Sequence, residues 1–218
     1  MTKTQQLDAL FSDWEDAIPY YKGKFIQDGI VNESEYEKIS PKILFIAKEP
    51  NNPEQTSGDF RQWWQKEIYY TFSYRIAEWA YGIINNFPPF DNIRENKESA
   101  HKALQQIAHM NIKKTGGSGS CNGGVVIEHY NQNSQYLQKQ IEIIAPDLII
   151  LCLSWNEIVR DGLFGKLAWI KSGYEINVAK WNNVKLIDFY HPSSRTAPAA
   201  SYSLLQNIIN SSIFKSLN

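Results

Sequence analysis

Four short apolar runs are the feature of this sequence that most constrains its fold. They cover residues 42–48, 107–112, 147–153 and 184–190, and they are rich in Ile, Leu and Val. Runs this short and this continuously apolar are typical of parallel strands buried on both faces, rather than of half-exposed antiparallel strands. Helical patterns separate the runs. The sequence therefore predicts an α/β chain with a parallel central sheet covered on both faces.

The helical patterns occupy residues 7–18, 65–85, 97–108 and 134–145, and the last of these is ended by Pro146. Ser154 and Glu157 have the spacing of a capping box, which predicts a helix from there to about residue 164. A final helix is expected after Pro198, and Asn182 and Asn183 indicate a tight turn before the fourth run. Ligands of open α/β sheets bind beyond the carboxyl ends of the strands, so we expect the functional residues there.

Length and composition favour one domain, residues 1–218, in a cytoplasmic protein. The net charge is −1, so no global positive field draws the chain to phosphate backbones. Two cysteines, Cys121 and Cys152, are too few for a disulfide scaffold, a four-cysteine zinc site or an iron–sulfur cluster. No stretch approaches the roughly 20 apolar residues of a membrane span. We expect a monomer without a cofactor and without a membrane partner.

Two motifs close the first and fourth runs. Residues 47–51 read Ala-Lys-Glu-Pro-Asn, and residues 191–195 read His-Pro-Ser-Ser-Arg. In this order and separation the pair resembles the signature motifs of the uracil-DNA glycosylase superfamily, typified by Gly-Gln-Asp-Pro-Tyr, Gly-Glu-Ala-Pro-Gly or Gly-Met-Asn-Pro-Gly and by His-Pro-Ser. Asn111 is similar to the strand-end asparagine that reads the base, and Phe60 resembles the phenylalanine that stacks on it.

The resemblance covers roughly residues 40–200 and leaves residues 61–96 as an insertion. It implies a three-layer α/β/α sandwich with a four-stranded parallel sheet in the order 2-1-3-4. It also implies a DNA glycosylase that hydrolyses the N-glycosidic bond of uracil, or of a related modified base, in single- or double-stranded DNA.

The implied chemistry explains why these residue types are needed. A base cannot be cut inside a duplex, so the nucleotide is extruded and its base held by stacking and by edge hydrogen bonds. Bond cleavage builds positive charge on the sugar and negative charge on the base. Glu49 would orient water and stabilise the sugar cation, and His191 would donate to the base oxygen. The implied base-binding residues are Lys48, Asn51, Phe60 and Asn111, and the implied DNA contacts are Lys113, Lys114, Ser193, Ser194 and Arg195.

Three departures from the family pattern leave alternatives open. Ala47 replaces the usual glycine, Glu49 stands where other members carry aspartate, asparagine or alanine, and Asn51 stands where the strictest uracil enzymes place a thymine-excluding tyrosine. A second hypothesis is therefore a module of the same fold that binds DNA or a nucleotide without cleaving it. A third is a different α/β hydrolase acting on a small nucleoside or nucleotide.

Other candidate residues receive structural interpretations. The remaining histidines, His101, His109 and His129, lack metal-ligand spacing, and we expect surface positions or satisfied core positions for them. The glycine-rich stretch 116–124 lacks the Gly-Lys-Ser/Thr of a P-loop. It is either a loop without a binding role or a backbone-amide surface near a phosphate.

Overall fold

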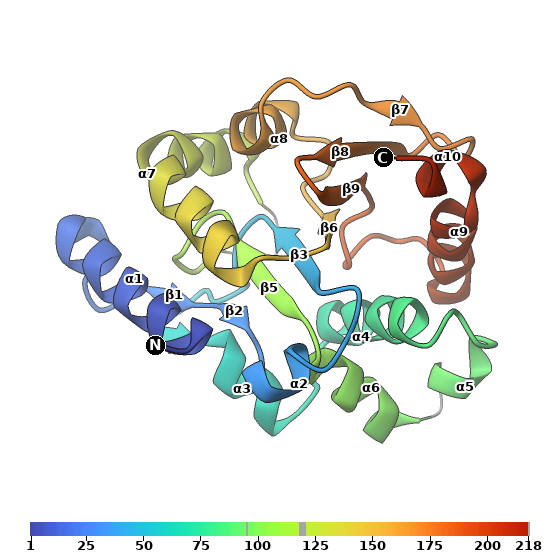
Figure 1. Cartoon of the computed structure of the whole chain (residues 1–218). Helices are drawn as coiled ribbons and strands as arrows, with labels where there is room; N and C mark the ends of the chain where they lie inside the picture. Colours follow the sequence, from blue (N-terminus) through green and yellow to red (C-terminus); the bar gives the residue numbers. More distant parts are fainter. Residues whose placement is uncertain (95, 118–120, 218) are drawn as a thin grey trace.

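The fold is built on a mostly parallel central sheet. The computed structural model describes residues 1–94, 96–117 and 121–217. Four neighbouring strands, β5 (Ala108–Asn111), β3 (Ile43–Ala47), β6 (Leu148–Leu151) and β9 (Val184–Asp188), are parallel (Figure 1). They are the four apolar runs of the sequence, and the expectation of an α/β chain with a mostly parallel sheet is confirmed.

The sheet is larger than the expected four strands. Its order is β2-β5-β3-β6-β9-β8-β7, with three antiparallel additions: β2 (Gly29–Ile30), β8 (Asn177–Trp181) and β7 (Ile170–Lys171). A tight turn joins β8 to β9, and Asn182 adopts the positive φ of 52° that such turns require. A separate two-stranded sheet pairs β1 (Ile26–Gln27) with β4 (Gly58–Asp59).

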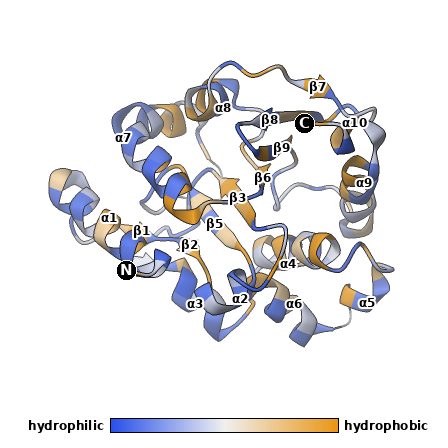
Figure 2. Cartoon of the chain, in the orientation of Figure 1, coloured by the Kyte–Doolittle hydropathy of each residue, from blue (hydrophilic) through white to orange (hydrophobic). Residues whose placement is uncertain are grey.

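Helices cover both faces of the sheet. Leu44 and Ile46 belong to a core that includes α1 (Lys3–Ala17), α7 (Gly123–Ile144) and α8 (Glu157–Phe164). Phe45 and Ala47 belong to the opposite core, with α4 (Thr71–Ile84), α6 (Lys97–Gln105) and α9 (Pro198–Asn210). In Figure 2 strand β3 is orange, whereas the helices around the sheet change between blue and orange along their length. Because both sheet faces are covered, every position of β3, β5 and β6 is buried, and only the first two residues of β9 are partly exposed.

Three helix predictions need correction. The single helix expected over 65–85 is two, α3 (Phe60–Lys66) and α4, because the backbone is extended at Glu67. The helix expected over 134–145 is the end of α7, which begins 11 residues earlier, where the Asn122 side chain accepts the Gly124 N–H at 2.9 Å. The cap of α8 is Asn156 rather than Ser154, since Asn156 Oδ1 accepts the Val159 N–H at 3.2 Å.

Short helices complete the chain. They are η1 (Pro19–Tyr21), α2 (Glu33–Tyr36), α5 (Asp91–Arg94) and α10 (Ser212–Lys215). Within the described residues, no helix combines the length and the apolar character that crossing a membrane requires.

Candidate functional site

The segments that follow β3 and β5 stay paired beyond the strands. The Ile112 N–H donates to the Ala47 carbonyl at 3.0 Å, and the Lys113 N–H donates to the Lys48 carbonyl at 2.9 Å. This pairing brings the first motif against the residues that follow Asn111. His191 lies three residues beyond β9 at the same carboxyl edge of the sheet. The two motifs and Asn111 therefore share one edge.

Glu49 is held in an ion pair that the sequence did not indicate. Lys113 Nζ lies 2.8 Å from Glu49 Oε2 and 3.0 Å from the Gly116 carbonyl, and only 9–10% of either charged side chain is exposed. A side chain at position 117 would collide with the Glu49 carboxyl group, so this close approach requires Gly117. The pair fixes one carboxyl oxygen and occupies the Lys113 ammonium. Residues 118–120 of the glycine-rich stretch, and with them much of its proposed amide surface, lie outside the described residues.

Asn111 is fully buried, and neither Nδ2 nor Oδ1 has a hydrogen-bond partner in the described part of the chain. Its backbone is nevertheless fixed, because its N–H donates to Asp28 Oδ2 at 2.8 Å. An unsatisfied buried amide costs about 1–3 kcal/mol, and native proteins rarely retain one without a ligand, a water or a functional role. The side chain lies on the same sheet face as His109, two residues earlier.

Aromatic rings connect the ends of β5 and β9. Phe60 packs 5.2 Å from the His109 ring, and Phe72 lies 5.6 Å from both His109 and His191, measured between ring centroids. Phe60 begins α3, where the Asp59 side chain caps the helix by accepting the Arg61 N–H at 2.8 Å. The expected stacking residue thus lies in one aromatic cluster with two imidazoles.

His191 is held as a neutral hydrogen-bond donor. Its Nδ1 accepts the Ser193 N–H at 3.2 Å, which leaves the proton on Nε2. The Ser194 N–H donates to the His191 carbonyl at 2.8 Å. Burial, with a smaller effect of the Lys48 charge, lowers the pKa of His191 to about 4. The imidazole is therefore neutral near pH 7 and carries a single N–H.

The remaining predicted base-binding residues lie around this edge. Lys48 is half-buried, and its Nζ donates to Ser154 Oγ at 3.2 Å, which ties the first motif to the end of β6. Asn51 is exposed and forms a β-bridge with Gly117. Neither side chain contacts Asn111 or His191 in the hydrogen bonds of the described residues.

The predicted DNA contacts divide into exposed and buried residues. Ser193 and Arg195 are exposed, and Ser194 is half-buried. Lys114 is fully buried, with its Nζ 2.6 Å from Asp28 Oδ1, so the expectation that it meets a phosphate is wrong for this structure. Burial lowers the pKa of Lys114, and the Asp28 carboxylate opposes that effect. Lys113, paired with Glu49, is likewise no free surface cation.

Sequence reasoning missed two residues at this edge, Asp28 and Trp155. Asp28 accepts hydrogen bonds from Asn111, Lys114 and Gln140, but as an isolated acid outside the apolar runs it carried no signal. Trp155, 50% exposed, packs edge-on against Tyr190 at 5.7 Å and has a left-handed φ of 57°.

His109 needs a further correction. We expected a surface position or a satisfied core position, but it is 1% exposed and neither ring nitrogen has a partner in the residues described. The other two histidines are bonded: His101 Nε2 lies 2.8 Å from the Trp64 carbonyl, and His129 Nδ1 lies 3.3 Å from the Tyr21 hydroxyl.

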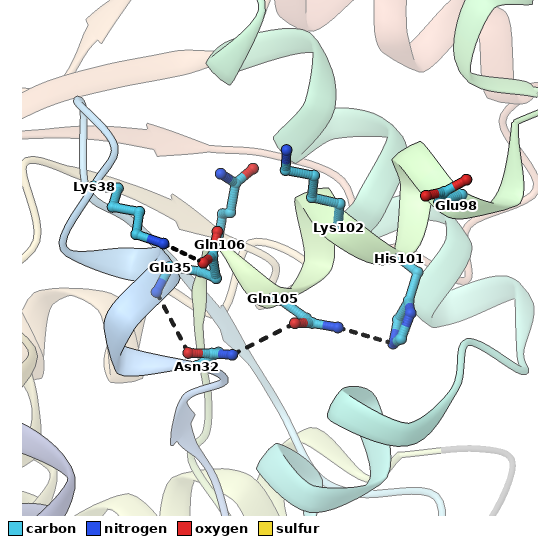
Figure 3. Close-up of a pocket in the computed structure, with 8 residues that line it drawn as sticks. All are labelled: Asn32, Glu35, Lys38, Glu98, His101, Lys102, Gln105 and Gln106. Carbon is cyan, nitrogen blue, oxygen red and sulfur yellow. Dashed lines mark hydrogen bonds and ion pairs between the residues drawn. The ribbon is translucent and has the colours of Figure 1, made fainter.

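A polar hollow lies away from this edge. It has a volume of about 610 Å³ and lies between α2 and α6, where α6 leads into the amino end of β5 (Figure 3). It carries both signs of charge, and its lining residues are Asn32, Glu35, Lys38, Glu98, His101, Lys102, Gln105 and Gln106. None of the predicted site residues lines this hollow.

Metal ligation finds no support in the arrangement. Among residues 1–94, 96–117 and 121–217, no three His, Cys, Asp or Glu side chains gather as a metal site would require. Burial, followed by the Glu49 charge, raises the pKa of the Cys121 thiol to about 11, so this cysteine is protonated near pH 7.

No protein-family model and no curated protein matches the chain.

Proposed function

We propose that this protein is a DNA glycosylase that hydrolyses the N-glycosidic bond of uracil, or of a related modified or deaminated base. One observation carries the proposal: the fully buried, unpartnered amide of Asn111 at the carboxyl end of β5, in the residues the structure describes. An amide offers a donor and an acceptor side by side, which suits the adjacent carbonyl and imino N–H of uracil. A base bound there would repay the cost of burying Asn111.

The neighbouring side chains suit the remaining steps. Phe60 offers a ring for stacking on an extruded base. The Nε2–H of His191 would donate to the base oxygen on which negative charge develops during cleavage. Glu49 would orient water near the sugar, with one oxygen fixed by Lys113. The observed neighbours β5-β3-β6-β9 have the order that the superfamily resemblance implies, which supports the same proposal.

The DNA strand would meet a small polar surface. Ser193 and Arg195 are exposed beside His191 and can contact a phosphate, and the Arg195 guanidinium can also stack on bases. Lys113 and Lys114 are left out of this surface because their ammonium groups are engaged internally.

One observation favours the second candidate, a module that binds a base without cleaving it. The Glu49 carboxyl group is engaged by Lys113, and a carboxylate occupied in this way is less able to activate water. Binding without cleavage would preserve the roles of Phe60 and Asn111 and would make His191 dispensable for affinity.

Alkali treatment of a uracil-containing oligonucleotide separates the candidates. Wild-type protein should create alkali-labile sites, and His191→Ala should abolish them. Lys102→Ala is the control, because Lys102 is exposed and lines the polar hollow near the amino end of β5. Binding without alkali-labile sites would support the module, and equal cleavage by His191→Ala would exclude the proposed mechanism.

A further inference from the structure

His109 presents a second unsatisfied polar side chain beside Asn111. It precedes Asn111 by two residues on β5, so both side chains lie on one face of the sheet. Within the described residues, all four polar side-chain atoms of the two residues are buried and lack a hydrogen-bond partner. Because both residues bury polar atoms without a hydrogen-bond partner, we look for one ligand that would satisfy them together.

Three aromatic rings pack around His109. The rings of Phe60, Trp64 and Phe72 lie 4.9–5.6 Å from the imidazole, measured between centroids. A leucine would fill such a space without the desolvation cost of about 1–3 kcal/mol that unsatisfied polar atoms incur. The imidazole is therefore maintained against the packing preference of its environment.

The protonation state limits what His109 can recognise. Burial, followed by the positive charge of Lys114, lowers its pKa to about 3. A neutral imidazole offers one N–H donor and one acceptor, as does a carboxamide. It therefore suits a neutral heterocycle, which can pair with both the donor and the acceptor.

The spacing places both side chains within reach of one ligand ring. Residues two apart on a strand are separated by roughly 6.6–6.8 Å. That separation is comparable to the width of a nucleobase together with its hydrogen bonds. The Phe60 ring contacts His109, so a base stacked on Phe60 and bound to Asn111 also faces the imidazole.

We propose that His109 is a second base-reading residue, which makes the site selective for a base with one more hydrogen-bonding atom than uracil. The inference rests on the proposed function. In that function, Asn111 engages the N3–H and O4 of uracil and His191 engages O2. No hydrogen-bonding group of uracil then remains for His109. The exocyclic hydroxyl of 5-hydroxymethyluracil or the N7 of hypoxanthine would supply the missing partner.

Single-turnover excision from three oligonucleotides tests this inference. They are identical except for one uracil, 5-hydroxymethyluracil or hypoxanthine, and the last two distinguish a hydroxyl from a ring nitrogen as the partner. Wild-type protein should excise one of these two at least about 10-fold faster than uracil. His109→Leu should lower that rate by about 100-fold or more, since a site built for a hydrogen bond depends on it strongly, while the uracil rate changes less than about 3-fold.

Controls separate recognition from folding and from the proposed function. His109→Gln keeps a donor and an acceptor and should retain part of the selectivity, whereas Lys102→Leu, at an exposed residue of the polar hollow, should leave all rates unchanged. If His109→Leu does not fold, ¹⁵N NMR of the His109 imidazole in the wild-type protein tests whether this side chain contacts the base. The His109 signals should shift when free hypoxanthine or 5-hydroxymethyluracil is added and not with uracil, and unshifted signals overturn the inference. Unchanged base ratios in His109→Leu overturn the inference while leaving the glycosylase proposal intact. If the wild type excises none of the three bases, both the base-reading role of His109 and the glycosylase proposal are refuted.

Discussion

His191 is the residue on which the proposed chemistry depends most. A neutral imidazole with its proton on Nε2 strengthens its hydrogen bond as charge develops on the departing base. His191→Ala should therefore lower the single-turnover rate roughly 100- to 1000-fold with little change in binding. Glu49→Gln should lower this rate by a smaller factor if the carboxylate only orients water. It should lower the rate by the same factor or more if the carboxylate stabilises the sugar cation. If His191→Ala excised the base at the wild-type rate, the proposed role of His191 as hydrogen-bond donor would be wrong.

The buried imidazole of His109 and the half-buried imidazole of His191 also make stability depend on pH. Their pKa values, about 3 for His109 and about 4 for His191, lie below the ordinary 6.5 of an unfolded histidine. The unfolded state therefore binds more protons as the pH falls below 6.5, and stability that is complete above 6.5 is lost toward pH 4. Between pH 7 and pH 4, the free energy of unfolding of His109→Leu should fall by about 2–4 kcal/mol less than that of the wild type. Urea unfolding at the two pH values measures this difference. An identical loss in both proteins would contradict the burial of an unpaired imidazole.

At the scale of elements, one buried network joins β2, β5 and α7. Asp28, immediately before β2, binds the Asn111 N–H, the Lys114 ammonium and the Gln140 amide at 2.6–2.8 Å. The network fixes the backbone that presents the Asn111 side chain. Its loss would therefore affect both stability and the position of the proposed base reader.

Asp28→Asn should destabilise the fold by about 3–5 kcal/mol, because it leaves the fully buried Lys114 ammonium without a carboxylate. Adding Lys114→Met should restore part of that loss, since the uncompensated charge is then removed. Urea unfolding of the single and double variants measures both effects. A loss below about 1 kcal/mol for Asp28→Asn would show that the pair contributes little.

Elements differ in how well the sequence predicted them. The four central strands were evident because burial on both faces leaves a continuous apolar run. Strands β2 and β7 have only two residues each, too short for any periodicity, and the break before α4 depends on tertiary packing. The motif residues were identifiable by resemblance. The pairs Glu49–Lys113 and Asp28–Lys114 were not, since a buried charge is chosen by a distant partner.

For the molecule as a whole, charge sets how it would meet DNA. The net charge is −1, and two of the expected phosphate-binding lysines are engaged internally. Binding should therefore depend weakly on salt, with a log–log slope on the order of −1 to −2, because each phosphate contact contributes about −0.9. Fluorescence anisotropy over a range of salt concentrations measures the slope. A slope steeper than about −4 would reveal cationic contacts that the proposed surface lacks.

The central claim is that the buried Asn111 amide reads a base that the protein then releases. Mass spectrometry of free base liberated from an oligonucleotide with a single uracil, 5-hydroxymethyluracil or hypoxanthine tests it most directly. For at least one of these bases, wild-type protein should release free base in amounts equal to the alkali-labile sites formed. Asn111→Leu should release at least about 100-fold less, because the amide contacts are lost. No free base from any of the three oligonucleotides with the wild type, or equal release by Asn111→Leu, would contradict the account.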